Sequence, residues 1–343
     1  MIQIFSKPML FVWIAFTLAI SGCSEKSKTE PTVQSQPNAN SSDRPLDKVT
    51  LLLNWYPEAE HGGYYAAMVH GIYAKHGLNV EIKPGGKTTV VPQELTIGRI
   101  QFGVGNADDV LMAREQAAPL VALMAPMQIG PRCIMVREDS GIKSFEELRN
   151  ITLQIDPARP YVPFMKSKRL LTDNVKTVPY FGTVAQLVSD PRTAQQAYSF
   201  SEPLMAEQRG VQVTKLMMSD LGYNPYASVL ISTEEYIKSN RDMAARMVKA
   251  SIEGWEKYLD APEETNKYIL SQNRQGMTEE ALAYGVTHLK PLCLPKDFDP
   301  ANLGLMEANR WIILTQQLQE LGMISDKVKA DEAFSTEFIS KPK

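Results

Sequence analysis

The chain has 343 residues, of which 22% are charged and 44% hydrophobic, and its formal net charge is −3. A slightly acidic chain without a basic stripe has no electrostatic footprint for nucleic acid, which excludes that class of partner. Its three cysteines and four histidines have neither the number nor the spacing of a disulfide framework or a structural metal site.

The first 22 residues are interpreted as a signal peptide. Lys7 supplies positive charge, and residues 9–20 form an apolar run shorter than the roughly 20 residues that a spanning helix needs. Small residues then precede Cys23, a pattern that looks like a bacterial lipobox. The sequence therefore predicts a lipoprotein signal peptide over residues 1–22 and an acylated Cys23, which would anchor the protein to a membrane in the cell envelope. An ordinary signal peptide with an accidental cysteine is the alternative.

Residues 23–47 are rich in Ser, Pro, Asn, Gln and Lys and contain almost nothing apolar. Such a segment cannot bury enough surface to offset its ordering entropy, so we expect a flexible tether. The remaining chain is too long for one compact core and predicts two lobes.

The most informative stretch begins with an apolar run at residues 49–53, which predicts a buried strand. Groups that can stack or hydrogen-bond follow it: Asn54, Trp55, Tyr56 and His61. Gly62 and Gly63 lead into a helical pattern over residues 64–76, and residues 78–82 predict the next strand. Such a unit places its loop at the carboxyl edge of a sheet, where open α/β sheets bind ligands. The alternative is that Trp55 and Tyr56 are core aromatics.

The pattern N-W-Y-P-x-x-x-H-x-G-x-Y-x-A over residues 54–67, with Gly-Ile-Tyr at 71–73 and Gly-Leu-Asn-Val at 77–80, resembles the bacterial solute-binding proteins for thiamine-precursor pyrimidines. Related eukaryotic pyrimidine synthases share it. The resemblance extends, with weakening detail, from about residue 48 to about residue 258.

The fold that this resemblance implies is α/β: a two-lobed periplasmic-binding-protein clamshell of type II. Each lobe would be a mostly parallel sheet flanked by helices. We expect lobe 1 over residues 48–132 and 229–343, and lobe 2 over residues 133–228, with a ligand-binding cleft between them.

In the first lobe, the pattern predicts helices at 93–98 and 110–116 and strands at 100–104 and 121–127. Asn106 and Asp108 lie between a strand and a helix, where capping alone would explain them; the resemblance implies that this loop also faces the cleft. Gln128, near the first crossing at 130–133, is placed where its amide could reach a ligand.

In the second lobe, the sequence predicts strands at 133–136, 151–155 and 175–180 and a helix at 163–171, and residues 211–217 lead to the second crossing. Thr183 is either a helix N-cap or a ligand contact. The resemblance implies that Glu202 faces the cleft, where its carboxylate would match an amine; a solvated glutamate at a helix N-terminus is the alternative. Tyr223 and Tyr226 lie in the second crossing, at 223–228.

The remaining chain predicts helices. Residues 243–258 have one apolar face, and further helices near 263–270, 279–289 and 303–321 are expected to pack outside lobe 1. Whether Cys133 pairs with Cys293 stays open.

The resemblance implies a lipid-anchored solute-binding component of an ABC importer, monomeric and without cofactor or metal. It would bind a small heteroaromatic ligand, an aminopyrimidine thiamine precursor first, and pass it to a permease driven by an ATPase. Asn54, Trp55, Tyr56, His61 and Gly62 would contribute to the site with the cleft residues named above. Binders of riboflavin, sulfonate and nitrate share this fold, and a sensing role stays open.

An enzyme like the pyrimidine synthases is the competing interpretation. Those enzymes carry a lysine for pyridoxal phosphate and a consumed histidine in the segment that aligns with residues 103–109. This chain has Gly105 and Asp109 there, and without the amine no Schiff base forms. No other catalytic motif is recognisable, so we expect a binding protein.

Overall fold

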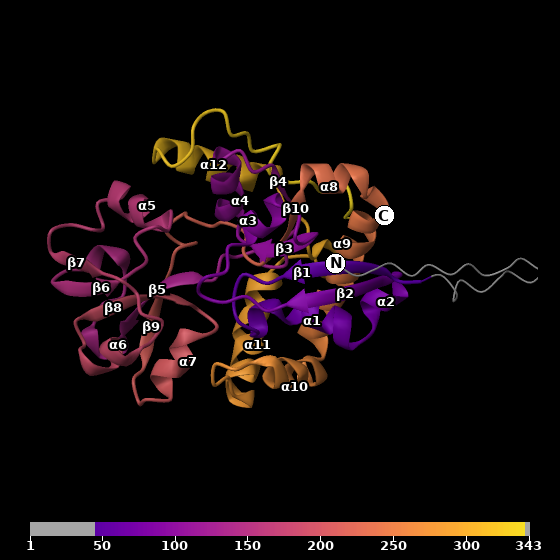
Figure 1. The fold of residues 1–343 in the computed structure, drawn as a ribbon. Coiled ribbons are helices and arrows are strands. Elements are labelled where there is room, and N and C mark those ends of the chain that lie inside the picture. The colour runs from indigo at the N-terminus through magenta and orange to yellow at the C-terminus, as the bar shows by residue number, and fades with distance from the viewer. Residues whose placement is uncertain (1–44, 340–343) are drawn as a thin grey trace, which may run out of the picture. The chain divides into compact units, whose positions relative to one another are not determined.

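The computed structural model describes residues 45–339, and within them the chain forms two separate five-stranded sheets with helices (Figure 1). The predicted signal peptide, Cys23 and all but the last residues of the predicted tether lie outside the described residues. Asp47, which the sequence placed in the tether, is instead the first residue of a strand. Among the described residues, no helix has the length and apolar character needed to cross a bilayer.

The first sheet has the strand order β2-β1-β3-β10-β4. Its strands are β1 (Asp47–Leu52), β2 (Leu78–Lys83), β3 (Phe102–Gly105), β4 (Leu120–Met124) and β10 (Val229–Thr233). Strand β1 is parallel to β2 and β3, whereas β10 is antiparallel to both of its neighbours. Four strands therefore run one way, as predicted, and the single reversed strand comes from far along the chain.

The second sheet repeats this plan in the order β7-β6-β8-β5-β9. Its strands are β5 (Arg132–Arg137), β6 (Ile151–Gln154), β7 (Val175–Val178), β8 (Thr193–Tyr198) and β9 (Val213–Met217). Here β5 is the reversed strand. The chain passes from the first sheet to the second between β4 and β5 and returns between β9 and β10.

The helix predicted over residues 64–76 is wrong as a single element. The structure has α1 (Gly62–Val69) and α2 (Ile72–Lys75), separated at Gly71. Gly71 adopts φ +67°, a left-handed conformation that ends a helix and that glycine reaches without steric cost. The loop before α1 contains one 3₁₀ turn, η2 (Ala59–His61).

The other helices flank the two sheets (Figure 1). They are α3 (Val91–Thr96), α4 (Ala107–Glu115), α5 (Tyr161–Ser167), α6 (Ala185–Ser189), α7 (Glu202–Glu207), α8 (Glu234–Ser239), α9 (Arg241–Asp260), α10 (Glu263–Gln272), α11 (Glu279–Cys293) and α12 (Ala308–Glu320).

Helix α1 packs closely on α9, and this contact fixes the start of α1. A Cβ on Gly63 would lie 2.1 Å from Cγ of the buried Trp255, and one on Gly62 would lie 1.9 Å from Tyr258 Cε1. Only glycine fits at these two positions, because the neighbours are large and buried rings. The packing therefore holds the loop that ends at His61 against the first sheet.

Arg310 of α12 ties the two crossings together. Its guanidinium donates to the carbonyl of Gln128 in the first crossing and to the carbonyl (2.7 Å) and side-chain oxygen (3.0 Å) of Asn224 in the second. Asn224 Oδ1 also accepts from the backbone N–H of Gly130, at 2.7 Å. The half-buried Arg310 thus links both connections between the sheets by hydrogen bonds, an arrangement called the clasp below.

The two cysteines of the described chain do not pair. Cys133 in β5 and Cys293 at the end of α11 are both free and buried. Burial raises the pKa of both thiols, so each behaves as a small apolar side chain.

Candidate ligand-binding site

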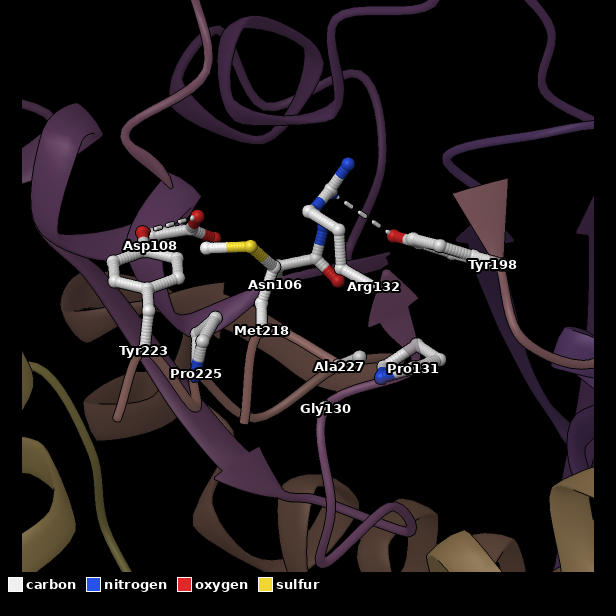
Figure 2. A pocket seen from close by; sticks show the side chains of 10 residues that line it. All are labelled: Asn106, Asp108, Gly130, Pro131, Arg132, Tyr198, Met218, Tyr223, Pro225 and Ala227. Carbon is white, nitrogen blue, oxygen red and sulfur yellow. Dashed lines mark hydrogen bonds between the residues drawn. The ribbon is translucent and has the colours of Figure 1, made fainter. Parts of the chain in front are cut away.

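A small pocket lies where parts of both sheets and the second crossing meet (Figure 2). The loop after β3 contributes Asn106 and Asp108, and the second sheet contributes Arg132 and Tyr198. The second crossing contributes Tyr223, Pro225 and Ala227. The pocket is therefore built from segments that lie far apart in the sequence.

Asn106 and Asp109 hold the N-terminus of α4. The Asp109 carboxylate accepts from the backbone N–H of Asn106 at 3.2 Å and from the Asn106 amide Nδ2, also at 3.2 Å. The backbone N–H of Asp109 donates to Asp108 Oδ1 at 3.1 Å. The side-chain oxygen of Asn106 is left buried without a partner among the described residues.

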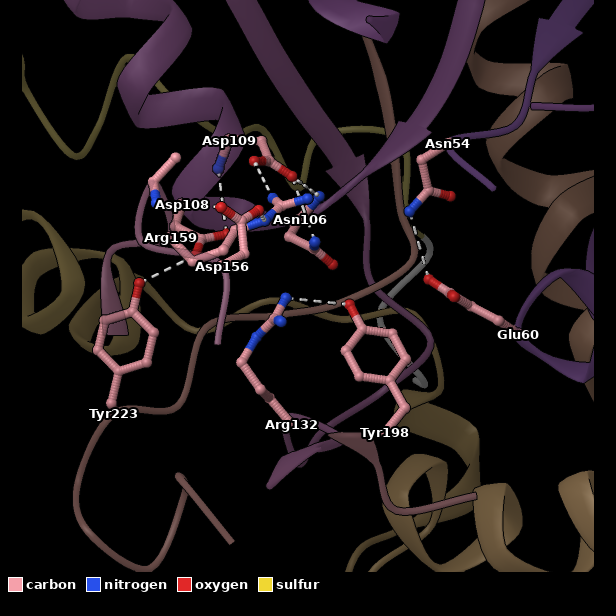
Figure 3. A network of polar contacts seen from close by, with 11 residues as sticks. Asn54, Glu60, Asn106, Asp108, Asp109, Arg132, Asp156, Arg159, Tyr198 and Tyr223 are labelled. Atoms are coloured by element: carbon pink, nitrogen blue, oxygen red, sulfur yellow. Dashed lines mark hydrogen bonds and ion pairs between the residues drawn. The ribbon is translucent and has the colours of Figure 1, made fainter. Parts of the chain in front are cut away.

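Two further contacts join this loop to other elements (Figure 3). Tyr223 donates its hydroxyl to Asp108 Oδ2 at 2.9 Å, and Arg159, which precedes α5, pairs with Asp109 at 3.2 Å. Burial raises the pKa of Asp109 and Asp108 raises it further, while Arg159 opposes both effects. The start of α4 is thereby connected to the second sheet and to the second crossing.

Arg132 opens β5 and is held between two tyrosines. Its guanidinium carbon lies 4.8 Å from the ring centre of Tyr161 and 5.1 Å from that of Tyr198, distances typical of cation–π contacts. It donates to the Tyr198 hydroxyl at 3.3 Å. Burial works against its charge, but the nearby Tyr198, Tyr161 and Asp108 outweigh burial, and the pKa of Arg132 is raised.

The loop after β1 supplies a chain of three polar side chains. His61 Nε2 lies 2.9 Å from Asn54 Oδ1, and Asn54 Nδ2 donates to Glu60 Oε1 at 3.5 Å. Burial lowers the pKa of His61 to about 3, so the ring is neutral and Nε2–H is the donor to the amide oxygen. Burial also raises the pKa of Glu60, to about 7.

Glu58 and Glu202 complete an acidic corner with Glu60. Glu202 accepts from the Tyr180 hydroxyl and from the backbone N–H of Tyr198, each at 2.8 Å. Burial raises the pKa of Glu58 and of Glu202, and the negative charges of Glu60 and Glu202 raise that of Glu58 further. Because Tyr198 lines the pocket, the hydrogen bond from its backbone N–H to Glu202 connects these glutamates with the pocket.

Three of the predicted site residues line the pocket: Asn106, Asp108 and Tyr223. Three others, Asn54, His61 and Glu202, do not line it and belong to the polar groups described above. Trp55 and Tyr56 are half-buried on the same loop as Asn54, with ring centres 5.2 Å apart in an edge-to-face arrangement. Their predicted role in stacking on a ligand stays a prediction.

Four predicted residues have other contacts. Gly62 is required by packing, and Gln128 donates its amide to the carbonyls of Ala125 and Leu305. Thr183 accepts from the backbone N–H of Ala185, which is the capping alternative. Tyr226 accepts from the Glu307 backbone and lies under Arg310, 3.7 Å from its guanidinium. None of the four lines the pocket.

Sequence reasoning missed Arg132, Tyr198, Glu60 and Arg159. Arg132 carried one usable signal: it is a charged residue immediately before an apolar strand, at a predicted crossing. Tyr198 was missed because β8 was missed. That strand reads Thr-Ala-Gln-Gln-Ala-Tyr, and Gln195 is fully buried although it is polar.

Among the described residues, no group of three or more His, Cys, Asp or Glu side chains could hold a metal ion. The carboxylates of the network are instead satisfied by tyrosine hydroxyls, backbone N–H groups and arginines.

The family described as NMT1/THI5 like matches residues 58–265, which is more than half of the chain and includes most of the network. The protein belongs to this family. The resemblance inferred from the motif around Asn54 is thereby confirmed.

Two relatives of this NMT1/THI5-like protein match it over most of its length. The chain is 25% identical to the riboflavin-binding protein RibY of Chloroflexus aurantiacus, over 96% of this chain and 97% of the relative. It is 24% identical to a formylaminopyrimidine-binding protein of Halalkalibacterium halodurans, over 88% and 93%.

Solved structures show the same fold. The aliphatic sulphonate-binding protein SsuA of Escherichia coli superposes with a TM-score of 0.65 at 14% identity, over 87% of this chain and 94% of that chain. The NMT1/THI5-like protein thus has the type II periplasmic-binding-protein fold, as predicted. At this identity the likeness concerns the fold and not the ligand.

Proposed function

We propose that this protein is the solute-binding component of an ABC importer and that its ligand is a flat nitrogen heterocycle, an aminopyrimidine first. The observation that carries the proposal is a cluster of acidic side chains on and beside one small pocket: Asp108 lines the pocket, and Glu202 accepts from the backbone N–H of the lining residue Tyr198. Glu58, Glu60, Glu202, Asp108 and Asp109 are close enough to influence one another or Arg132, whereas only Arg132 and Arg159 oppose them.

Such an acidic site favours a ligand that donates hydrogen bonds. An aminopyrimidine amine would donate to Glu202, whose oxygens keep lone pairs beyond the two bonds that they already accept. A hydrogen bond to a charged group contributes roughly 1.5–3 kcal/mol. A sulfonate or nitrate would bring these acidic groups no hydrogen-bond donor, and each carboxylate that is ionised would repel it. The acidic corner therefore supports an amine-bearing ligand over an anion.

Riboflavin is the second candidate, because the relative that matches over 96% of this chain is named a riboflavin-binding protein. A flavin ring would also suit Trp55 and Tyr56, since offset stacking contributes about 0.5–1.5 kcal/mol beyond area burial.

The rest of the assignment follows from the importer role. A lipid on Cys23 would hold the protein at the extracytoplasmic face of a membrane, where it would act as a monomer and pass its ligand to a permease and its ATPase. An enzymatic role like that of the pyrimidine synthases lacks support, because no lysine stands at Gly105 or Asp109 to form a Schiff base.

Calorimetry with 4-amino-5-hydroxymethyl-2-methylpyrimidine, riboflavin, taurine and nitrate tests the proposal. We expect the aminopyrimidine to bind the wild-type protein and Glu202→Gln to weaken it, because a neutral amide accepts less strongly than a carboxylate. Trp55→Ala should weaken binding about tenfold or more through lost stacking and burial. Tyr284→Ala, which removes an aromatic ring on α11 outside the pocket, is the matched control. Binding of taurine or nitrate without either heterocycle would refute the proposal.

A further inference from the structure

Arg132 has hydrogen-bonding capacity that the protein does not use. A guanidinium carries five N–H donors, and the one hydrogen bond that the Arg132 guanidinium donates within the described residues is the 3.3 Å contact with the Tyr198 hydroxyl. No carboxylate of the described chain lies within ion-pair distance of it. The rings of Tyr161 and Tyr198 hold the cation by stacking, which leaves N–H groups free at its edge.

Asn106 has a hydrogen-bond acceptor that the protein does not use. The residue is 5% exposed, and its Oδ1 has no partner in the described part of the chain. Nδ2 is the atom that donates to Asp109, since a carboxylate can only accept, and this assigns the free atom as oxygen. Figure 3 shows that oxygen pointing away from Asp109. A buried acceptor without a partner costs free energy comparable to a lost hydrogen bond.

Both side chains line the same pocket (Figure 2). We propose that Arg132 and Asn106 together bind one edge of the ligand, at which a hydrogen-bond acceptor adjoins an N–H donor. Arg132 donates to the acceptor, and Asn106 Oδ1 accepts from the N–H. The inference rests on the proposed function and adds the chemistry of a second corner, separate from Glu60 and Glu202.

This edge occurs in both candidate ligands. In a 4-aminopyrimidine, a ring nitrogen accepts beside the donating exocyclic amine. In the pyrimidinedione ring of a flavin, a carbonyl oxygen accepts beside a ring N–H. The pocket selects the donor–acceptor edge, and the experiment decides which molecule carries it.

An anion is a poor match for the same corner. Asp108 raises the pKa of Arg132, and Arg132 in turn partly opposes the burial that raises the pKa of Glu60, Glu202 and Asp109. Arg132 therefore already lies in the electrostatic field of several acidic side chains, although none is in direct contact with it. A neutral acceptor uses its free N–H groups without adding a further negative charge.

The test is calorimetric titration of the full-length protein with 4-amino-5-hydroxymethyl-2-methylpyrimidine and with riboflavin. The variants are Arg132→Met, Arg132→Lys and Asn106→Ser. Arg114→Met is the matched control, because the Arg114 side chain is 10% exposed and pairs with Glu234 and Glu332, outside the pocket. Thermal unfolding of each variant separates lost binding from lost folding.

For the probe that binds the wild type, we expect Arg132→Met to weaken binding about 10- to 100-fold and Asn106→Ser about tenfold. The affinity of Arg132→Lys should lie between those of the wild type and Arg132→Met, because lysine keeps the positive charge but lacks the planar set of N–H donors of a guanidinium. In the double variant, the loss of affinity should be smaller than the product of the losses in Arg132→Met and Asn106→Ser, since both side chains contact the same edge of the ligand. Arg114→Met should lower the unfolding temperature and bind as the wild type does.

The remaining outcomes separate the two proposals. Wild-type affinity in both Arg132→Met and Asn106→Ser would overturn the inference and leave the proposed function intact. If neither heterocycle binds the wild type, the proposed function fails and the inference fails with it. If taurine binds the wild type and Arg132→Met abolishes that binding, the corner is an anion site and the inference is wrong.

Discussion

At the scale of single residues, Glu60 makes the stability of the protein depend on pH. Burial raises its pKa from 4.5 to about 7, so the folded protein favours the neutral carboxyl. Its contribution to stability is fully present below pH 4.5 and is lost as pH rises through about 7. We expect the free energy of unfolding of the wild type, relative to Glu60→Gln, to fall by on the order of 2–3 kcal/mol between pH 5 and 8. Urea unfolding at both pH values measures this.

The control for this prediction is Glu81→Gln, which changes an exposed glutamate on β2. It should show no such difference between the two pH values. A Glu60→Gln variant whose stability follows that of the wild type at every pH would show that the Glu60 carboxyl is not desolvated as the structure indicates.

The residues that the sequence could and could not predict differ in their surroundings. Asn54, Asn106 and Tyr223 were predictable because each follows an apolar strand or lies in a crossing, where topology alone brings side chains to a site. Glu60 and Arg132 could not be placed this way. The importance of Glu60 comes from its burial, and that of Arg132 from its contact with Tyr161 on α5, which is distant in the sequence.

At the scale of elements, the clasp around Arg310 determines how firmly the two crossings are connected. Arg310→Met should lower the free energy of unfolding by about 2–4 kcal/mol, because three hydrogen bonds to oxygens of the half-buried Gln128 and Asn224 are lost. Urea unfolding measures the change. Arg192→Met, which removes an exposed arginine near β8, should change stability by less than about 0.5 kcal/mol. Equal effects of the two substitutions would contradict the clasp.

Most elements were predictable because apolar runs and turn residues alternate along the chain, and the misses have local causes. The helix over 64–76 was drawn through Gly71, whose left-handed backbone became visible only in the structure. Strand β8 was not predicted because one of its fully buried residues, Gln195, is polar, so the sequence lacked the apolar pattern of a core strand. Sequence periodicity reports burial only where buried residues are apolar.

At the scale of the whole molecule, the predicted anchor on Cys23 lies outside the described residues and is tested chemically. We expect mass spectrometry of the N-terminal peptide from the membrane fraction to show Cys23 as the first residue, carrying acyl chains. Several chains together give stable anchoring, whereas one gives only marginal binding. Cys23→Ser should abolish the acylated peptide, and Ser24→Ala should leave it. An unmodified Cys23 in the wild type would refute the lipoprotein prediction.

The central claim is that the pocket between Asn106, Arg132 and Tyr198 takes a flat nitrogen heterocycle. The most direct measurement is mass spectrometry of the small molecules released when protein purified from its native envelope is denatured. The proposal predicts a single heteroaromatic species at close to one equivalent, an aminopyrimidine or a flavin, that is absent from preparations of the Arg132→Met variant. Release of an aliphatic sulfonate or another anion instead, with no heterocycle, would contradict the account.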